Sequence, residues 1–204
     1  EGDGSTEVDA LATSLEVNAE VSEGAIEDLP EATNIGSTLT NLRSGVFFKD
    51  EKMGMNEEQW AKITPEVKRR LKLICHYGAV QSLKKEEMFL IQAHSIPIMC
   101  MDKPVNLVAQ ALGGAGKTVA FCIGLLSRID TKLEHTQGLI IGMTRELARM
   151  IYYDALVPLG AFLGYDDEGK EQINPPLRAR LVLPDNAGLT RQDPYKEHVI
   201  VGTP

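Results

Sequence analysis

The sequence predicts an α/β fold in which helices flank a parallel sheet and a phosphate-binding loop joins one strand to one helix. A glycine-rich stretch at 111–118 lies between a short apolar run and a longer apolar segment, which is the order strand, turn, helix. Further apolar runs alternate with segments of helical periodicity as far as Pro204. An acidic stretch without aromatic residues precedes this region and is predicted to be a disordered tail.

The first 42 residues carry ten acidic side chains and no lysine, arginine or aromatic residue. The rest of the chain contains 19 acidic and 21 basic residues, so the net charge of -8 arises from the tail, and the body can still meet an anionic partner. The tail is either an inert solubilising extension or a regulatory, partner-binding segment. We predict a tail and linker over residues 1–56, with a small apolar anchor at 46–48, and a globular domain over 57–204.

Cysteine usage and hydropathy restrict the compartment. Cys75, Cys100 and Cys122 form no CxxC pair, and the apolar surroundings of Cys122 indicate a buried thiol. This favours a reducing compartment, cytoplasmic, nuclear or both. No apolar run reaches the roughly 18–20 residues of a membrane span, so we expect no membrane insertion. The chain begins at Glu1 and stops at Pro204 within an expected element, which indicates a fragment of a longer protein.

Two helices are predicted before the glycine-rich loop. Thr64-Pro65-Glu66 is a helix start, and apolar residues follow it at helical spacing. Basic residues lie among them and form either an RNA contact or a solvated helix face: Lys68, Arg69, Arg70 and Lys72. A second helix is expected from Glu86 to about Ser95, where Ile96-Pro97 should disrupt or redirect it.

The α/β alternation begins at residue 106. Strands are predicted at 106–110, 138–142, 180–183 and 198–201, with helices over about 117–129 and 144–164. Right-handed crossovers between parallel strands would place the glycine-rich loop at the carboxyl edge of the sheet.

The loop has the composition of a phosphate cradle. Its glycines allow backbone N–H groups to point inward, and the following helix adds the positive end of its dipole. Lys117 is expected to reach the β- and γ-phosphates, and the Thr118 hydroxyl to ligate Mg²⁺. The predicted nucleotide-binding residues of the loop are Ala111, Leu112, Gly113, Gly114, Ala115, Gly116, Lys117 and Thr118, and the last two are the expected catalytic residues.

These motifs together resemble the DEAD-box RNA helicases. The string 111–118 is similar to that family's first nucleotide motif, in which alanine commonly replaces the first glycine. Thr144-Arg145-Glu146-Leu147-Ala148 resembles the first RNA-contacting motif, and 199–204 resembles the strand that enters the next one. The run 104–110 looks closest to the branch that remodels messenger RNA–protein complexes during nuclear export. The resemblance covers roughly residues 60–204 and implies part of an N-terminal RecA-like, ATP-binding lobe.

The resemblance implies an enzyme that uses ATP and Mg²⁺ to unwind or remodel RNA and RNA–protein complexes. It also implies RNA, mRNA-export proteins and nuclear-pore proteins as partners. The RNA-binding residues that it implies are Thr144, Arg145, Glu146, Thr203 and Pro204. Hydroxyl groups and helix N-termini suit phosphodiesters and carry no base information. The alternative for Thr144 is a plain helix N-cap.

Gln92 resembles the glutamine with which this family reads adenine. A carboxamide donates and accepts hydrogen bonds at once, which matches the N6 and N7 edge of adenine. An aromatic residue upstream is expected to stack on the base, and Trp60 is one candidate. Met88 stands where the family usually has proline. The alternative is a polar residue on an exposed helix face.

Residues 1–204 contain no Asp-Glu-Ala-Asp sequence, which in this family supplies the carboxylates that organise Mg²⁺ and the attacking water. This segment alone is therefore expected to bind nucleotide without turning it over. Met143 and Met150 also depart from the family pattern. Two alternatives stay open: another P-loop NTPase, such as a DNA helicase or translocase, and a catalytically decayed nucleotide- or RNA-binding scaffold.

Overall fold

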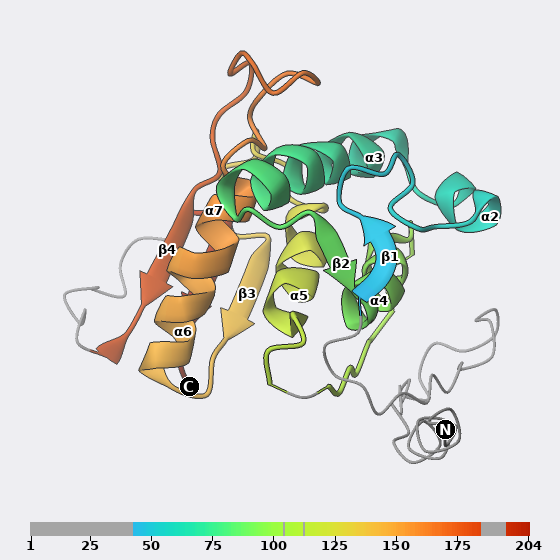
Figure 1. The fold of residues 1–204 in the computed structure, drawn as a ribbon. Coiled ribbons are helices and arrows are strands. Elements are labelled where there is room, and N and C mark those ends of the chain that lie inside the picture. The colour runs from blue at the N-terminus through green and yellow to red at the C-terminus, as the bar shows by residue number, and fades with distance from the viewer. Residues whose placement is uncertain (1–42, 104, 112, 185–194) are drawn as a thin grey trace, which may run out of the picture.

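The computed structural model describes residues 43–103, 105–111, 113–184 and 195–204 (Figure 1). Its main sheet has three parallel strands in the order β3-β5-β4, namely Gly138–Ile141, Val199–Gly202 and Ala179–Val182. β5 is central, and all four of its residues are buried. Branched aliphatic residues suit such a strand, because both of its faces pack. The predicted α/β fold with a parallel sheet flanked by helices is confirmed.

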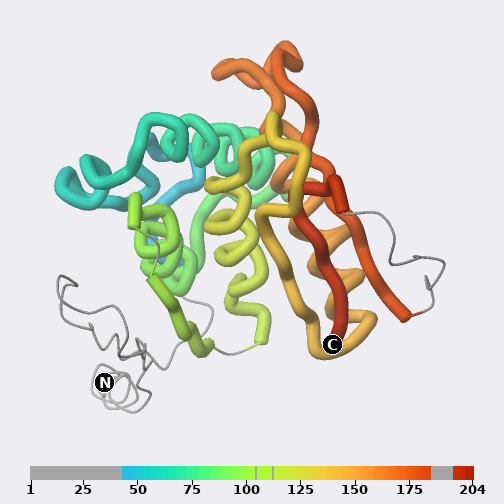
Figure 2. The backbone as a smooth tube through the Cα atoms, turned by 180° about the vertical axis from the view of Figure 1, so that it is seen from behind, coloured from blue at the N-terminus to red at the C-terminus, as the bar shows by residue number. Residues whose placement is uncertain are grey.

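Two helical segments accompany the sheet. α5 (Lys117–Leu126) follows the glycine-rich loop. α6 (Arg145–Ile151) continues through a π-helical turn, η2 (Tyr152–Leu156), into α7 (Val157–Gly160), so the expected helix over 144–164 forms in three parts. α6 and α7 lie across the sheet in Figure 1, and Figure 2 shows the strands in front of them from the opposite side.

The N-terminal helices are α2 (Glu57–Ala61), α3 (Pro65–Lys72) and the π-helical η1 (Leu73–Ser82). The Thr64 hydroxyl accepts the Val67 N–H at 3.4 Å and caps α3, with Pro65 in its first turn. This is the helix start that the sequence predicts, because proline at the first helical position leaves no internal hydrogen bond unmade.

Residues 43–56 belong to the folded body, so the prediction that they form a linker is wrong. β1 (Arg43–Phe47) pairs antiparallel with β2 (Glu87–Phe89). The side chains of Phe48, Met53 and Met55 are buried in the core. Burial of these three large apolar side chains stabilises a segment whose local sequence is rich in turn-forming and charged residues.

The helix expected at 86–95 begins and ends elsewhere. β2 occupies its first residues, and α4 runs from Leu90 to Cys100 with Pro97 inside it. Ile96, Pro97 and Cys100 are all buried. Their packing outweighs the one backbone hydrogen bond that proline removes.

The strand expected at 106–110 does not form. Residues 105–111 have no regular secondary structure, and Val108 is 57% exposed. A strand needs a hydrogen-bonded neighbour, yet within the described ranges β3 pairs with β5 alone. Leu139 and Ile141 on β3 are more than half exposed. The apolar residues at 106–110 therefore do not form a strand, because no strand in the described ranges pairs with them.

The three cysteines are buried thiols, as predicted for Cys122. Burial raises the pKa of Cys122 to about 12 and that of Cys100 to about 11, and it also raises the pKa of Cys75. These thiols therefore stay protonated and packed at neutral pH. Within the part of the chain that the structure describes, no helix has the length and apolar character needed to cross a membrane.

Gly78 marks a backbone contact between η1 and α7. A Cβ on Gly78 would lie 2.3 Å from the carbonyl oxygen of Leu159, so Gly78→Ala forces the two elements apart. We expect it to lower the free energy of unfolding by about 1–3 kcal/mol, measured by urea denaturation. Gly113→Ala is the control, because a Cβ there meets nothing within 4 Å. Equal stability of the two variants would contradict this account.

His198 makes stability depend on pH. It is fully buried before β5, and its Nδ1 accepts the Arg178 backbone N–H at 2.9 Å. Burial lowers the pKa of His198, and the charge of Arg178 lowers it further. Because the pKa in the folded state lies below that of the unfolded chain, the stabilisation is complete above about pH 6.5 and is lost as the pH falls toward the folded pKa.

The measurement is urea unfolding at about pH 8 and about pH 5. His198→Gln keeps an acceptor for the Arg178 N–H but cannot titrate, so the loss of stability at acid pH should shrink. His76, whose pKa burial also lowers, should contribute to the loss that remains. A loss that is undiminished in His198→Gln would refute this role.

Candidate functional site

The glycine-rich loop leads into α5 through backbone conformations that glycine adopts without strain. Gly114 has a φ of 80° and Gly116 a φ of 83°, both in the left-handed region. Gly116 is the N-cap of α5, and no side chain caps this helix among the residues described. The first helical bond runs from the Ala120 N–H to the Gly116 carbonyl at 3.1 Å. The first turn of α5 therefore presents N–H groups and a positive dipole end to an anion.

The remaining loop residues surround this helix start. The Lys117 ammonium donates to the Ala111 carbonyl, which holds it at the loop. Ala115 is buried beneath the loop, and Thr118 lies half-buried in the first turn of α5. Gly113 and Gly114 are exposed, with open space where a Cβ would lie. Leu112, also predicted here, lies outside the described residues.

Gln92 contacts the loop directly. Its side chain is 1% exposed, its Oε1 accepts the Phe89 N–H at 2.8 Å, and its Nε2 donates to the Gly116 carbonyl at 3.1 Å. A Cβ on Gly116 would lie 2.4 Å from this Nε2. The alternative of an exposed helix face is wrong. The carboxamide joins α4 to the loop and keeps one further N–H that can donate.

A cavity of about 420 Å³ lies beside Gln92. Its wall combines two phenyl rings, a carboxamide and charged side chains: Arg43, Phe47, Lys84, Lys85, Glu86, Glu87, Phe89 and Gln92. Trp60 is not part of it; its ring lies under the Lys68 ammonium, 4.9 Å from the centroid. Phe47 is 46% exposed and lines this cavity, so it is the candidate for the stacking position at which Trp60 was expected. The sequence Val46-Phe47-Phe48 could have indicated this residue, because side chains alternate along a strand: Phe48 is buried, so Phe47 faces outward.

The predicted RNA-contact residues gather at the ends of two neighbouring strands. Ile141 of β3 pairs with Gly202 of β5, and the Gly142 N–H donates to the Gly202 carbonyl at 2.8 Å. The segments 144–146 and 203–204 follow these ends directly. They therefore lie at one edge of the sheet, although they are far apart in sequence.

Thr144 caps α6, because its hydroxyl accepts the Leu147 N–H at 3.1 Å. This is the N-cap alternative, and the hydroxyl can still donate its hydrogen to an outside acceptor. Arg145 and Glu146 are exposed on the first turn of α6. The N-terminal end of α5 and the carboxyl ends of β3 and β5 lie at the same end of the molecule (Figure 1).

The residues present fit a metal ion only in company with a nucleotide. No group of three or more His, Cys, Asp and Glu side chains that could hold a metal ion occurs in the described ranges. Thr118, next to the loop, offers one hydroxyl ligand. Mg²⁺ commonly takes most of its ligands from phosphates and water, so this single oxygen suits a nucleotide-bound ion.

The two loop glycines allow a matched test. Gly116→Ala places a Cβ against Gln92 in a backbone conformation that L-residues rarely adopt, whereas Gly113→Ala meets open space. We expect Gly116→Ala to weaken ADP binding at least about tenfold, as measured by calorimetry, and Gly113→Ala to change it less than about twofold. A reversed order would show that the loop does not bind in the conformation described.

Comparison with known proteins gives consistent matches. Residues 89–174 match the family model of the DEAD/DEAH box helicase, a range that includes Gln92, the loop and 144–146. DEAD-box ATP-dependent RNA helicase 38 of Arabidopsis thaliana is 30% identical over 201 residues, covering 94% of this chain and 34% of that protein. ATP-dependent RNA helicase DBP5 of Scheffersomyces stipitis is 34% identical over 114 residues, covering 56% of this chain and 20% of that protein. The chain thus spans about a third or less of the length of these relatives.

Solved structures point the same way. S. cerevisiae Dbp5 bound to RNA and ADP BeF3 superposes with a TM-score of 0.50 at 25% identity, over 70% of this chain and 30% of that one. A variant of the same protein, bound to Nup159, a Gle1 variant, IP6 and ADP, gives a TM-score of 0.50 at 25% identity, over 69% and 31%. With the motif residues in place, these matches show that residues 89–174 form part of a DEAD-box helicase domain.

Proposed function

We propose that this chain is the ATP-binding part of an ATP-dependent RNA helicase, an enzyme that hydrolyses ATP to unwind or remodel RNA and RNA–protein complexes. The observation that carries this proposal is the hydrogen bond from Gln92 to Gly116, which places a cavity with room for a base beside the glycine-rich loop. The family match and the RNA helicase names of the relatives support it.

The proposed nucleotide extends from the loop to the cavity. Its phosphates meet the N–H groups at the start of α5, the ammonium of Lys117 and a Mg²⁺ ion held partly by Thr118. The ion, when bound, neutralises charge on the phosphates. The adenine enters the cavity, where Phe47 offers a ring face and Gln92 its remaining N–H. The ADP in the S. cerevisiae Dbp5 complexes supports this use of the site.

The proposed RNA path runs along the carboxyl edge of the sheet. Thr144, Arg145 and Thr203 contact phosphodiesters there, so binding is independent of base sequence and weakens with salt. Because the loop and this edge share one end of the molecule, nucleotide and RNA bind near each other. The RNA in the S. cerevisiae Dbp5 complex supports this path.

The cellular setting follows from the same relatives. The DBP5 relatives, and the Nup159 and Gle1 found with S. cerevisiae Dbp5, support a role in mRNA export with nuclear-pore partners. We place the protein in the cytoplasm, the nucleus or both. Hydrolysis needs carboxylates, which the loop at 111–118 does not contain, and residues 1–204 carry no Asp-Glu-Ala-Asp sequence. These 204 residues are therefore proposed to bind ATP without hydrolysing it.

Two variants with crossed readouts test the function. Lys117→Ala should weaken ATP binding by about tenfold or more, because a charge-assisted contact to phosphate is lost, while RNA binding changes little. Arg145→Gln should weaken RNA binding and leave ATP binding little changed. It should also make RNA affinity depend less steeply on salt concentration. Calorimetry measures ATP binding, and fluorescence anisotropy of a labelled single-stranded RNA measures the second affinity.

Each failure has its own meaning. Unchanged ATP binding in Lys117→Ala would favour a decayed scaffold. A preference for DNA over RNA in the anisotropy assay would favour another P-loop translocase. RNA-stimulated ATP hydrolysis by residues 1–204 would contradict the proposal that they only bind.

A further inference from the structure

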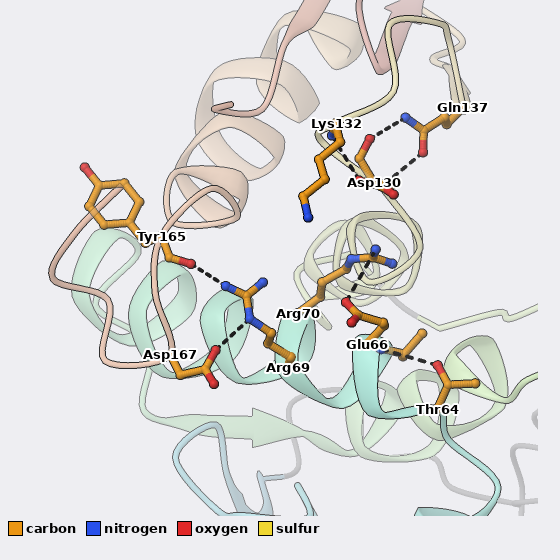
Figure 3. A network of polar contacts seen from close by, with 10 residues as sticks. Thr64, Glu66, Arg69, Arg70, Asp130, Lys132, Gln137, Tyr165 and Asp167 are labelled. Atoms are coloured by element: carbon orange, nitrogen blue, oxygen red, sulfur yellow. Dashed lines mark hydrogen bonds and ion pairs between the residues drawn. The ribbon is translucent and has the colours of Figure 1, made fainter. Parts of the chain in front are cut away.

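A second hollow lies away from the loop, between α3 and the turn that follows α5. It has a volume of about 190 Å³. Its lining includes charged side chains from α3 and from the turn after α5: Glu66, Arg69, Arg70, Asp130 and Lys132. Figure 3 shows Arg69 and Arg70 on α3 and Lys132 on the facing turn, with the Lys132 ammonium between the two guanidinium groups in this view. α3 and the turn after α5 thus bring together cations from distant parts of the sequence.

Two of these cations make few contacts with the protein. The Arg70 side chain is only 17% exposed, yet its one ionic partner among the described residues is Glu66 at 3.9 Å, beyond hydrogen-bond distance. The Lys132 ammonium has no hydrogen-bond or ionic partner in the same ranges; only its backbone N–H is bonded, to Asp130 Oδ1 at 2.9 Å. A guanidinium has five N–H donors and an ammonium three. Most of this capacity has no partner among the described protein groups.

Arg69 is held rigidly at the edge of the hollow. Its Nε donates to Asp167 Oδ1 at 2.6 Å and its Nη2 to the Tyr165 carbonyl at 2.6 Å (Figure 3). These two bonds fix the guanidinium plane, so a ligand at its Nη1 would meet a pre-organised donor. Pre-organisation lowers the entropy cost of binding.

The acids nearby select the size of the ligand. Glu66 and Asp167 are 71% and 59% exposed, so solvent screens much of their charge. Together with Asp130 they equal the three cations in number, which weakens the attraction for a long polyanion such as RNA. What remains is the short-range attraction of an anion to the hydrogen-bond donors of the arginine and lysine side chains. It fits one compact oxyanion.

This hollow is separate from the nucleotide loop. The loop precedes the first residue of α5, whereas Ile129 to Lys132 follow its last residue. The ten residues of α5 place about 15 Å of helix between the two. Figure 1 shows α3 at the end of the molecule opposite the N-terminus of α5.

We propose that Arg69, Arg70 and Lys132 form a second anion site, which binds one phosphate group, either inorganic phosphate or the phosphomonoester of a small molecule. Arg70 and Lys132 donate to the phosphate oxygens, and Arg69 closes one side. Bidentate Arg–phosphate pairs and Lys point charges are the common partners of this ligand.

The test is a titration of the ¹⁵N-labelled chain with inorganic phosphate at constant ionic strength, in which chloride is exchanged for phosphate. The arginine Nε–H signals and the Thr131 and Lys132 amides should shift and saturate. Arg70→Gln and Lys132→Gln should each weaken binding about tenfold, since each removes charge-assisted donors. Glu66→Gln should tighten it, because Arg70 loses its competing carboxylate.

Lys196→Gln is the matched control, because it removes the same charge from an exposed position outside the hollow and should leave the titration unchanged. A Lys117→Ala background removes phosphate binding at the loop, and the signals of the hollow should still saturate there. Glycerol phosphate in a second arm distinguishes a phosphomonoester from inorganic phosphate as the preferred ligand.

Three results would overturn the proposal. The first is a shift that grows linearly and equals that in chloride, which would mean a solvated cluster of ion pairs. The second is saturation that survives both Arg70→Gln and Lys132→Gln. The third is a response to a short RNA without any response to phosphate.

Discussion

The hydrogen bond from Gln92 to the Gly116 carbonyl is the constraint on which the site depends. It joins α4 to the last residue of the loop, while the Phe89 N–H holds the other end of the same carboxamide. Both bonds are made in a nearly dry environment, where an unpaired amide would be costly. The bond therefore sets the loop, the start of α5 and the cavity in one relative position.

Close packing between α4 and α5 supports this arrangement. A Cβ on Gly124 of α5 would lie 2.8 Å from the Met99 side chain of α4, so the helices approach as near as a glycine permits. α4 keeps its course through Pro97 because its buried residues pack into the same core. The packing of α4 against α5 thus positions the Gln92 carboxamide, and the carboxamide in turn holds the glycine-rich loop.

Two groups of hydrogen-bond donors that suit anions lie at opposite ends of the folded body. At the end with the loop, the proposed phosphate site consists of backbone N–H groups and Lys117 and so needs few side chains. At the opposite end, Arg69, Arg70 and Lys132 gather from α3 and the turn after α5. The near-neutral charge of the body therefore conceals two local excesses of donors. The net charge of the body reveals neither group, because hydrogen-bond donors act only over short distances, whereas net charge sums over the whole surface.

Much of this protein was predictable from short stretches of its sequence. The glycine-rich loop, the helix start at Thr64 and the strands at β3, β4 and β5 follow from rules that act over a few residues: φ preferences, capping and periodicity. The motif strings also sufficed for the family. Such features need no knowledge of what packs against them.

Only the tertiary structure decided the rest. Residues 106–110 have the composition of a strand but lack a paired neighbour, and 43–56 resemble a linker but bury Phe48. Phe47, rather than Trp60, reaches the cavity because β1 pairs with β2 some forty residues later in the chain. Likewise, Arg70 and Lys132 share a hollow that no local pattern encodes. Pairing, burial and convergence depend on which distant segments meet, and that is a property of the packed chain.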